Sequence, residues 1–560
     1  MAEKKQTKKK PAAKKLRIIP IGGLHEIGKN LTVLEYGSDI LVIDCGMAFP
    51  DEDMYGIDIV IPDFSYLIEN ADKVRGVFIT HAHEDHIGAV PYLLDQLNVP
   101  VYGTKLTIGF IRKKLLEFGM GGDLREFTPG DVIKCGCFKV ETIHTTHSVA
   151  DSVAFAIDTP VGKIFHTGDF KVDFTPVDGQ PIDLARLAEL GREGVLLLMA
   201  DSTNAMRKGY TPSEAIVGKS LDTIFAATPQ RIIIATFSSN VYRVQKIIDL
   251  AVKNHRKVAV SGRSMESMVQ IAAELGYLKI PANTLVDIKK IKDIPDSKLV
   301  VITTGSQGEP MSALARMAYG EHKNVKIRPK DVVVLSSSPV PGNEKSVSNI
   351  VNALMEKGAD VIYNDIAETH VSGHACQEEL KLIHSLIKPK FFMPVHGEFK
   401  HLRSHAELAE SMGMKEKNIL FADNGDVIEL TKAKASVSEE KVPAEGILVD
   451  GLGVGDVGSS VLNERKILSE SGLVVISAGF SNGMVVSGPE LYTKGFLYVK
   501  EYGEILEYAK QVLSECFMNA ESQGITDIQT LKTMATSTLK KFIREKMERT
   551  PVILPIFIEF

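Results

Sequence analysis

The sequence predicts an α/β protein of about three or four folding units. The chain has 560 residues, and a globular domain takes roughly 100–200 of them. From residue 17 onward, short apolar runs alternate with helical patterns, which is the order typical of α/β architecture. Hydrophobic residues make up 44% and charged residues 24% of the chain. This composition is ordinary for a globular protein and excludes collagen-like, wholly disordered and disulfide-scaffold classes.

Composition also limits the location and the partners of the chain. The longest apolar runs, such as VLLLMA at 195–200, are far shorter than the roughly 20 residues of a membrane span. The five cysteines suggest no disulfide framework and indicate a reducing, cytoplasmic compartment. Cys135 and Cys137 lie too close together for a zinc motif. Because the net charge is −6, any site for a polyanion must be a local basic groove.

The N-terminal segment, residues 1–16, is basic. The stretch MAEKKQTKKKPAAKKLR holds seven Lys and one Arg against one Glu. No apolar segment follows it, so it is not a secretory signal. We expect a solvated tail, and the alternative is a weak arm that binds RNA or ribosomes.

Apolar runs predict the strands in order, and amphipathic patterns predict helices between them. The predicted strands are 41–43, 74–79, 163–165, 195–199, 231–236, 257–260, 298–303, 331–335, 360–363 and 390–395, and the predicted helices include 241–253, 265–275, 345–357 and 376–387. After about residue 450 the pattern changes to strands, a long amphipathic helix near 501–520 and a basic stretch at 532–548. We therefore expect a linker at 446–465 and a small α+β domain at 466–560.

One glycine motif imitates a nucleotide-binding fingerprint. Residues 453–458 fit the pattern GxGxxG after an apolar run, but the fingerprint requires that a helix begin there. The following sequence, SSVLNERKILSESG, predicts a turn and another strand. We therefore do not expect a dinucleotide site.

The strongest chemical signal is the segment HAHEDH at 81–86. Three imidazoles and a carboxylate follow directly after the predicted strand 74–79, and packing does not explain such a group. Imidazole and carboxylate are good ligands for zinc or manganese. His147, Asp169 and His396 also lie where predicted strands end, which is where open α/β sheets hold their sites. A carboxylate such as Asp169 can bridge two cations that lie about 3.5–4 Å apart.

This pattern resembles the metallo-β-lactamase superfamily. The resemblance implies that His81, His83 and His147 hold one metal, that Asp85, His86 and His396 hold the other, and that Asp169 lies between them. It also implies that Asp44, in LVIDCG, is the buried residue that orients the HAHEDH loop; the alternative is an ordinary turn residue at a strand end. The fold that it implies is an αββα sandwich.

The long gap between Asp169 and His396 indicates an inserted domain. An insertion of this size, at 208–370, resembles the β-CASP group of nucleases, whose motifs match Asp201 in MADSTNA, His374 in HVSGHA and His396 in PVHGE. The tracts GGLHEIGKN, DSTNA, FSSNVYRVQ, TGSQGEP and VSGHA are similar to bacterial ribonuclease J. The expected domains are a metallo-β-lactamase domain in two parts, 17–207 and 371–445, the β-CASP domain between them, and the C-terminal α+β domain.

The resemblance implies a ribonuclease with two divalent cations per chain. It implies 5′→3′ exonuclease activity that favours 5′-monophosphate ends, endonuclease activity, and roles in mRNA decay and rRNA maturation. It further implies dimers or tetramers that form through the C-terminal domain, and the chain could meet RNA-degradation or ribosome partners. The choice between zinc and manganese stays open.

The catalytic candidates are His374, Asp201 and Asp85. Hydrolysis needs an acid for the departing alkoxide, and His374 can supply the proton while Asp201 holds its tautomer. The predicted substrate contacts are His370, Val371, Ser372, Gly373 and His374, together with Ser238, Ser239, Asn240, Arg243 and Ser264 at helix starts, which favour anions. Serine at such positions is often only a helix cap. Phe49 could stack a base, or it is simply a core or loop residue.

Other functions remain as alternatives. The acidic loop Asp51, Glu52, Asp53 and Asp58, with Asp450, offers ligands for a structural calcium, or it is a solvated loop. A β-CASP nuclease that acts on DNA would carry the same ligands. A non-catalytic RNA-binding paralogue would be expected to lose ligands, and all are present here. A small-ester hydrolase would have no use for the large insertion or for His374.

Overall fold

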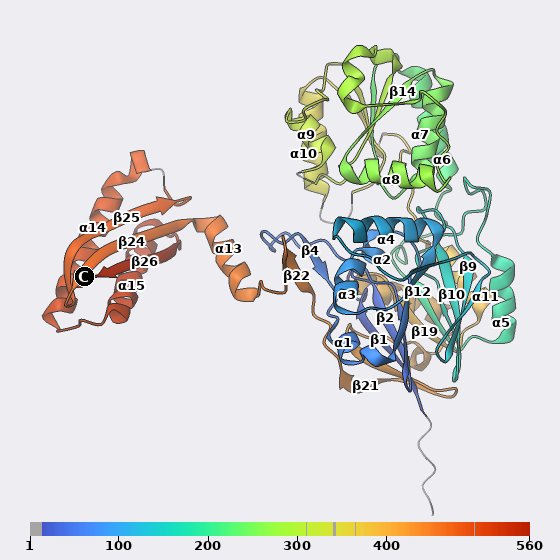
Figure 1. Cartoon of the computed structure of the whole chain (residues 1–560), viewed down its shortest axis with the longest axis horizontal. Coiled ribbons are helices and arrows are strands. Elements are labelled where there is room, and N and C mark those ends of the chain that lie inside the picture. Colours follow the sequence, from blue (N-terminus) through green and yellow to red (C-terminus); the bar gives the residue numbers. More distant parts are fainter. Residues whose placement is uncertain (1–13, 310, 340–342, 365, 498) are drawn as a thin grey trace, which may run out of the picture. The chain divides into compact units, whose positions relative to one another are not determined.

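The computed structural model describes residues 14–309, 311–339, 343–364, 366–497 and 499–560 (Figure 1). The predicted basic tail lies almost wholly outside these residues. The chain divides into two compact units. One consists of Met1–Ala48 and Ile61–Gly446, and the other of Phe49–Val60 and Ile447–Phe560.

Two sheets form the centre of the first unit. The first sheet contains β1 (Leu16–Gly22), β2 (Leu31–Tyr36), β3 (Asp39–Ile43), β5 (Val74–Phe78), β6 (Val101–Thr104), β7 (Leu124–Phe127), β20 (Asp426–Leu430) and β21 (Ala435–Lys441), in the order β21-β20-β1-β2-β3-β5-β6-β7. The second contains β8 (Val132–Cys135), β9 (Phe138–His144), β10 (Val153–Thr159), β11 (Gly162–His166), β12 (Leu197–Asp201) and β19 (Phe391–Val395), in the order β19-β12-β11-β10-β9-β8.

The inner faces of these sheets form one hydrophobic core. Phe78 of the first sheet packs edge-on against Phe155 of the second, with ring centroids 6.0 Å apart. Helices α5 (Leu184–Glu193), α11 (Gln377–Ile387) and α12 (Phe399–Ser411) pack on the outer face of the second sheet. Helices α1 (Ser65–Glu69), α2 (Glu84–Ile87), α3 (Val90–Gln96) and α4 (Lys105–Glu117) lie on the other side of the sandwich (Figure 1). The predicted αββα sandwich is confirmed.

A third sheet belongs to the inserted segment. It contains β13 (Ile232–Ala235), β14 (Lys257–Ser261), β15 (Leu285–Val286), β16 (Leu299–Thr303), β17 (Val332–Leu335) and β18 (Asp360–Ile362), all parallel, in the order β15-β14-β16-β13-β17-β18. Helices α6 (Glu214–Ala227) and α7 (Val241–Lys253) lie on one side, and α9 (Ala313–Tyr319) and α10 (Glu344–Glu356) on the other (Figure 1). Runs such as VVVL are apolar throughout because helices cover both faces of a parallel sheet.

The insertion also contacts the sandwich directly. Helix α8 (Arg263–Glu274) of the insertion packs on α4, and a Cβ added to Gly109 of α4 would lie 2.7 Å from a methyl group of Leu275. The short 3-10 helices Ala71–Lys73, Ile288–Asp293, Asp296–Lys298 and Glu416–Asn418 complete the first unit.

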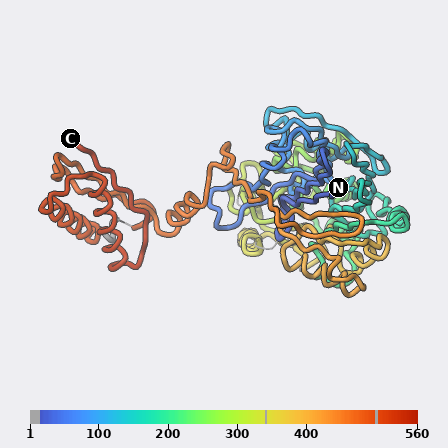
Figure 2. The backbone as a smooth tube through the Cα atoms, turned by 90° about the horizontal axis from the view of Figure 1, so that it is seen from below, coloured from blue at the N-terminus to red at the C-terminus, as the bar shows by residue number. Residues whose placement is uncertain are grey.

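The second unit contains a small sheet covered by two long helices. Strands β24 (Leu473–Ser481), β25 (Met484–Lys494) and β26 (Val552–Glu559) pair in the order β25-β24-β26, and α14 (Val499–Ser522) and α15 (Ile528–Met547) pack on one face. These elements are the orange-to-red segments that end at the C-terminus in Figure 2. A second small sheet contains β4 (Ile59–Ile61), β22 (Ile447–Asp450) and β23 (Gly453–Val454).

The predicted strand after residue 458 is wrong. Residues Ser459–Ser471 form α13, and Gly458 and Gly472 are the cap residues that flank it. The run LNERKIL consists mostly of good helix formers, and their propensity outweighs the few apolar residues that suggested a strand. The glycine motif nevertheless lies in the antiparallel hairpin of β22 and β23, where Val449 pairs with Val454, and a dinucleotide fingerprint needs a βαβ unit instead.

The ten predicted strands and four predicted helices of the first unit are confirmed, with slightly shifted bounds. The predicted long helix of the second unit is α14, and the basic stretch forms α15. All five cysteines are free. Within the part of the chain that the structure describes, no helix is both long and apolar enough to cross a membrane.

Candidate metal centre

Strand ends bring the predicted ligands to one edge of the sandwich. Strand β12 pairs in parallel with both β11 and β19, so the turns that follow these strands meet at one edge. Asp169, the end of β12 at Asp201, and His396 therefore lie near each other. The HAHEDH segment follows β5 in the facing sheet.

Asp44 holds the HAHEDH loop. It follows β3 with φ at +61°, and its carboxylate accepts hydrogen bonds from Thr80 N at 2.8 Å and from His86 Nδ1 at 2.8 Å. The backbone of the next residues runs along the loop, with Cys45 N donating to His86 O. A Cβ on Gly46 would lie 1.6 Å from Asp85 O, so only glycine fits there. The structure thus gives Asp44 the neighbours that the sequence predicted for it.

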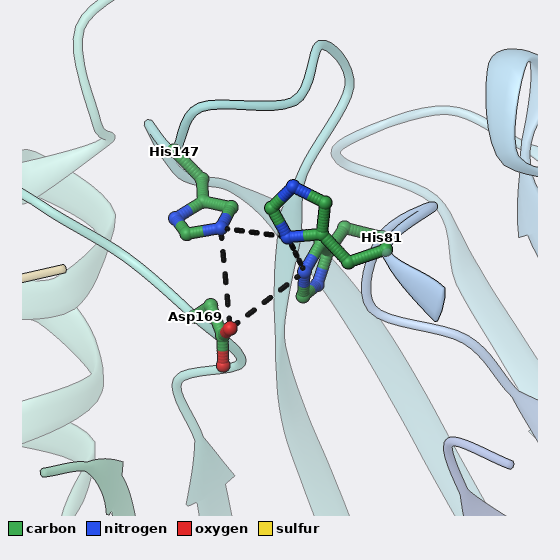
Figure 3. Close-up of side chains that lie close together, drawn as sticks. His81, His147 and Asp169 are labelled. Atoms are coloured by element: carbon green, nitrogen blue, oxygen red, sulfur yellow. Dashed lines mark hydrogen bonds and ion pairs between the residues drawn. The ribbon is translucent and has the colours of Figure 1, made fainter. Parts of the chain in front are cut away.

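The first ligand group contains His81, His83, His147 and Asp169. Nε2 of His81 lies 3.0 Å from Nδ1 of His83, and Nε2 of His147 lies 3.2 Å from the same Nδ1. Oδ2 of Asp169 lies 3.7 Å from His81 Nε2 and 3.9 Å from His147 Nε2. Figure 3 shows His81 and His147 pointing toward Asp169. Ring nitrogens that face one another in this way are arranged around a common point.

The second group contains Asp85, His86, Asp169 and His396. Nε2 of His396 lies 3.2 Å from Asp85 Oδ2. Nε2 of His86 lies 3.3 Å from Asp169 Oδ2 and 3.6 Å from Asp85 Oδ2. Asp169 is the member that both groups share, so the seven residues predicted as ligands are all brought together.

Further residues orient the ligand rings. Nδ1 of His147 donates to the carbonyl of Gly373 at 2.7 Å, which leaves Nε2 with a free lone pair. Nδ1 of His396 contacts Thr203 Oγ1 at 2.7 Å. A Cβ on Gly373 would lie 2.6 Å from the His147 ring, so this close approach requires glycine. Sequence reasoning missed Thr203, although its position two residues after Asp201 was a signal.

Electrostatics divides the histidines into two kinds. Burial lowers the pKa of His81 and of His147 well below the usual range, and it lowers the pKa of His83 to about 4. Burial opposes charge on His396 too, but the Asp169, Asp201 and Asp85 carboxylates together raise its pKa to about 10. Neutral imidazoles offer their lone pairs at once, whereas His86 and His396, whose pKa is raised, would lose a proton to solvent when a cation binds.

One atom of the cluster has no hydrogen-bond partner. Oδ2 of Asp169 is buried and accepts no hydrogen bond, although ring nitrogens surround it. Burial would raise the pKa of this carboxyl group, but the His396 and His86 imidazoles hold it well below its usual range. A buried carboxylate with an unused lone pair is costly and fits a cation. The donor set of imidazole and carboxylate is that of divalent zinc or manganese.

His374 and Asp201 form a pair beside the cluster. Nδ1 of His374 lies 2.8 Å from Asp201 Oδ2. Burial opposes charge on His374, but the Asp201 carboxylate raises the pKa of the imidazole above its usual value. Asp201 itself is fixed, because its Oδ1 accepts hydrogen bonds from the amide and the hydroxyl of Thr203. The pair therefore offers a proton next to the ligand groups.

The other predicted substrate contacts divide into loops and a buried residue. His370–His374 forms one loop, in which Ser372 Oγ accepts from Asn204 Nδ2 at 2.8 Å and from His374 N at 3.2 Å, and Val371 is buried. Ser238 and Ser239 are half-buried, Ser264 is exposed, and Asn240 caps α7. Arg243, which was also predicted to contact substrate, is 1% exposed at its side chain and bonds to Glu214, Ser336 and His370.

Two predicted features lie in the second unit. Phe49 is 74% exposed, so the alternative of a core residue does not hold. In the acidic loop, Asp58 Oδ2 accepts from Gly451 N, and Asp450 pairs with Arg465 at 2.5 Å. Among the described residues, all groupings of three or more metal-ligating side chains lie in the cluster of the first unit.

Four family descriptions match successive parts of the chain. They are "Metallo-beta-lactamase superfamily" over residues 26–223, "Ribonuclease J, beta-CASP domain" over 229–354, "Zn-dependent metallo-hydrolase RNA specificity domain" over 358–420 and "Ribonuclease J C-terminal domain" over 460–560.

Similar proteins cover nearly the whole chain. Ribonuclease J 1 of Streptococcus pyogenes serotype M3 is 44% identical over 97% of this chain and 97% of its own length. Ribonuclease J2 of Bacillus subtilis strain 168 is 44% identical over 98% of this chain and 100% of its own. The chain belongs to the ribonuclease J family. Ribonuclease J of Thermus thermophilus is also 44% identical, over 97% of this chain and 95% of its own.

Membership of the ribonuclease J family makes the chain a metal-dependent ribonuclease of the β-CASP group. The matched families, together with the cluster of histidines and aspartates, indicate that the chain binds divalent metal. A crystal structure of a protein of unknown function from Enterococcus faecalis V583 has the same fold, with a TM-score of 0.53 and 18% identity over 74% of this chain and 100% of that chain.

Glu379 is a further residue of this ribonuclease J site that the sequence did not reveal. It is fully buried. Its Oε1 accepts from Val172 N at 2.7 Å, and its Oε2 accepts from Thr211 N and Cys376 N, each at 2.7 Å. These amides belong to the turns that carry Asp169, Asp201 and His374. One carboxylate thus holds three segments of the site together.

Proposed function

We propose that the chain hydrolyses RNA phosphodiester bonds with two divalent cations. His81, His83 and His147 would hold one cation, and Asp85, His86 and His396 the other, with Asp169 between them. The observation that carries this proposal is the buried, unpartnered Oδ2 of Asp169, which both ligand groups share. When bound, the cations would lower the pKa of an attacking water and stabilise charge on a phosphoryl oxygen.

Hydrogen bonds from neighbouring residues orient the proposed ligand side chains. Asp44 and Thr203 orient His86 and His396, and Gly373 fixes the tautomer of His147. Such outer partners typically change metal affinity about 10–100-fold when they are lost. Zinc and manganese both suit this donor set, and zinc is the proposed ion.

His374 is the proposed general acid. The 3′-oxygen of the cleaved bond leaves poorly without a proton, and a positioned acid supplies it. The hydrogen bond to Asp201 fixes the proton on Nδ1 and favours the imidazolium form, so Nε2 can donate. Asp85, a ligand at the edge of the second group, completes the proposed catalytic set.

The loop at 370–374 is the proposed site for the 5′-phosphate of the RNA. It follows the insertion and faces the turn Ser238–Asn240, since the rings of Phe237 and His370 lie 6.2 Å apart. Ser238, Ser239, Val371, Ser372 and Ser264 are the remaining proposed contacts, and Phe49 is the proposed base contact. A site for a 5′-monophosphate would give 5′→3′ exonuclease activity beside endonuclease activity. We further propose roles in mRNA decay and rRNA maturation in the cytoplasm.

A comparison of RNA ends tests this proposal. The same RNA is prepared with a 5′-monophosphate, a 5′-triphosphate or a 5′-hydroxyl, and product lengths are measured with zinc or manganese present. Mononucleotides should accumulate much faster from the monophosphate form than from the other two, while internal cleavage should occur in all three forms. A DNA of the same sequence is the control for the alternative substrate.

Three outcomes of that assay decide between the alternatives. Equal release of mononucleotides from all three ends would reject the 5′-phosphate site. Equal or faster cleavage of the DNA would favour the DNA nuclease. RNA binding without cleavage under any divalent ion would favour a non-catalytic scaffold.

The C-terminal domain is the proposed surface for homodimers or homotetramers. The face of its three-stranded sheet opposite the helices carries Tyr492, Leu554, Ile556 and Ile558, which are 46–62% exposed. An exposed apolar face of this kind often marks an interaction surface. Light scattering of the full chain should give the mass of two or four chains, and the mass of one chain would contradict the proposal.

A further inference from the structure

His370, in the loop proposed to receive the 5′-phosphate, has an unusual neighbour. Nη1 of Arg243 lies 3.3 Å from Nδ1 of His370. A guanidinium can only donate, so Nδ1 of His370 must accept and carries no proton. In the neutral ring the proton is then on Nε2, which becomes a hydrogen-bond donor.

Arg243 itself is held from both sides. Its Nε and Nη2 donate to the two carboxylate oxygens of Glu214, at 2.6 and 2.8 Å, and its Nη1 donates to Ser336 O at 2.5 Å. A fork of this kind fixes the plane of a guanidinium. Since the side chain is 1% exposed, Arg243 has no access to a ligand and acts on His370 instead.

The backbone beside His370 is fixed to the same region. Ser336 Oγ donates to Thr369 O at 2.7 Å, and Thr369 Oγ1 donates to Leu335 O at 2.9 Å. Both contacts join the residue before His370 to the end of β17. Contacts with the β-CASP domain therefore fix both the position of the His370 ring and the position of the backbone that carries it.

The surroundings of His370 favour an anion. Burial and the positive charges of Arg243, Lys171 and Arg207 lower the pKa of His370 to about 3. The ring therefore stays neutral at physiological pH and keeps its tautomer. Arg243 and Lys171 each lie beside a carboxylate, so the positive charge left to attract a phosphate is that of Arg207.

We infer that Arg243, held by Glu214, is a positioning residue that presents Nε2–H of His370 to the 5′-phosphate and so sets the preference for monophosphorylated RNA. This inference rests on the proposed 5′-phosphate site. It goes beyond that proposal by naming two residues, Arg243 and Glu214, that determine the end specificity although neither would touch the RNA.

The test uses the full chain with Arg243→Lys. Lysine keeps the charge but presents its donors from a single nitrogen, which cannot reproduce the two-pronged bond to Glu214 together with the separate bond to His370. The measured quantity is the ratio of kcat/KM for mononucleotide release from 5′-monophosphate RNA to that from 5′-hydroxyl RNA. This ratio should fall about tenfold or more, as expected when a hydrogen bond to a charged group is lost.

Arg231→Lys is the matched control. Arg231 is also buried in the β-CASP domain, but its side chain forms a forked pair with Asp331 and donates to Lys326 O. This variant should be destabilised to a similar extent and should keep the wild-type ratio. If Arg243→Lys does not fold, Glu214→Gln weakens the same fork and should lower the ratio in the same direction.

A double variant separates orientation from a general structural effect. If Arg243 acts through His370, Arg243→Lys combined with His370→Ala should have the ratio of His370→Ala alone. An unchanged ratio in Arg243→Lys, or an equal loss in the Arg231→Lys control, would overturn the inference. A wild-type ratio of one would instead reject the 5′-phosphate site on which it rests.

Discussion

Asp169→Asn is expected to lower kcat for RNA cleavage by on the order of 10³-fold, because the change removes several kcal/mol of charge stabilisation at the cations. Asp169 is the member shared by both ligand groups, and its Oδ2 is buried without a hydrogen-bond partner. A neutral amide has no charge to balance two cations and directs either an N–H or a weaker acceptor at them. We therefore expect the purified variant to hold less metal than the wild type.

Metal content per chain, cleavage rate and thermal unfolding are measured together. Unfolding should change little, since the substitution keeps the shape of the side chain. Asp39→Asn is the control, because Asp39 begins β3 at the end opposite Asp44, and its carboxylate accepts from Arg75 Nε and Cys137 N. The control should retain its metal and its rate. An Asp169→Asn enzyme with wild-type rate and metal would contradict the two-cation assignment.

His374→Ala should slow cleavage about 10²–10⁴-fold, which is the usual contribution of a general acid, while the metal content stays at the wild-type level. His374 pairs with Asp201, and it also lies within reach of Asp169 and His396 as a possible ligand, but it is assigned to neither of the two proposed cation sites. Loss of the ring removes the proton donor for the departing 3′-oxygen.

The leaving group provides the decisive comparison. An RNA with sulfur in place of the bridging 3′-oxygen has a leaving group that needs no protonation, so the variant should cleave it at close to the wild-type rate when a thiophilic ion is supplied. Asp201→Asn should show the same pattern with a smaller loss. Metal loss in His374→Ala would mean that His374 is a ligand and not an acid.

The ligand cluster could be predicted because its chemistry is local. The segment HAHEDH carries four potential ligands directly after a strand, and the rules for strand ends locate His396 and Asp169 at the same edge. What could not be predicted are the contacts that tertiary folding alone creates. The carbonyl of Gly373, which orients His147, comes from the far end of the insertion.

Arg243 and α13 show two different limits of sequence reasoning. An arginine near a helix start fits an anion site, and only burial and the fork with Glu214 reveal that its donors are occupied. No residue of α13 is buried, so no apolar face marks this helix in the sequence. Only the helix propensity of its residues indicated this helix, and propensity predicts secondary structure weakly.

The carboxylate of Glu379 shows how the large insertion joins the sandwich without displacing the candidate metal ligands. It binds Thr211, where the chain departs for the insertion, and Cys376, just after the chain comes back. Both crossings are thus anchored at one carboxylate, so Glu379 fixes where the insertion leaves the sandwich and where it re-enters.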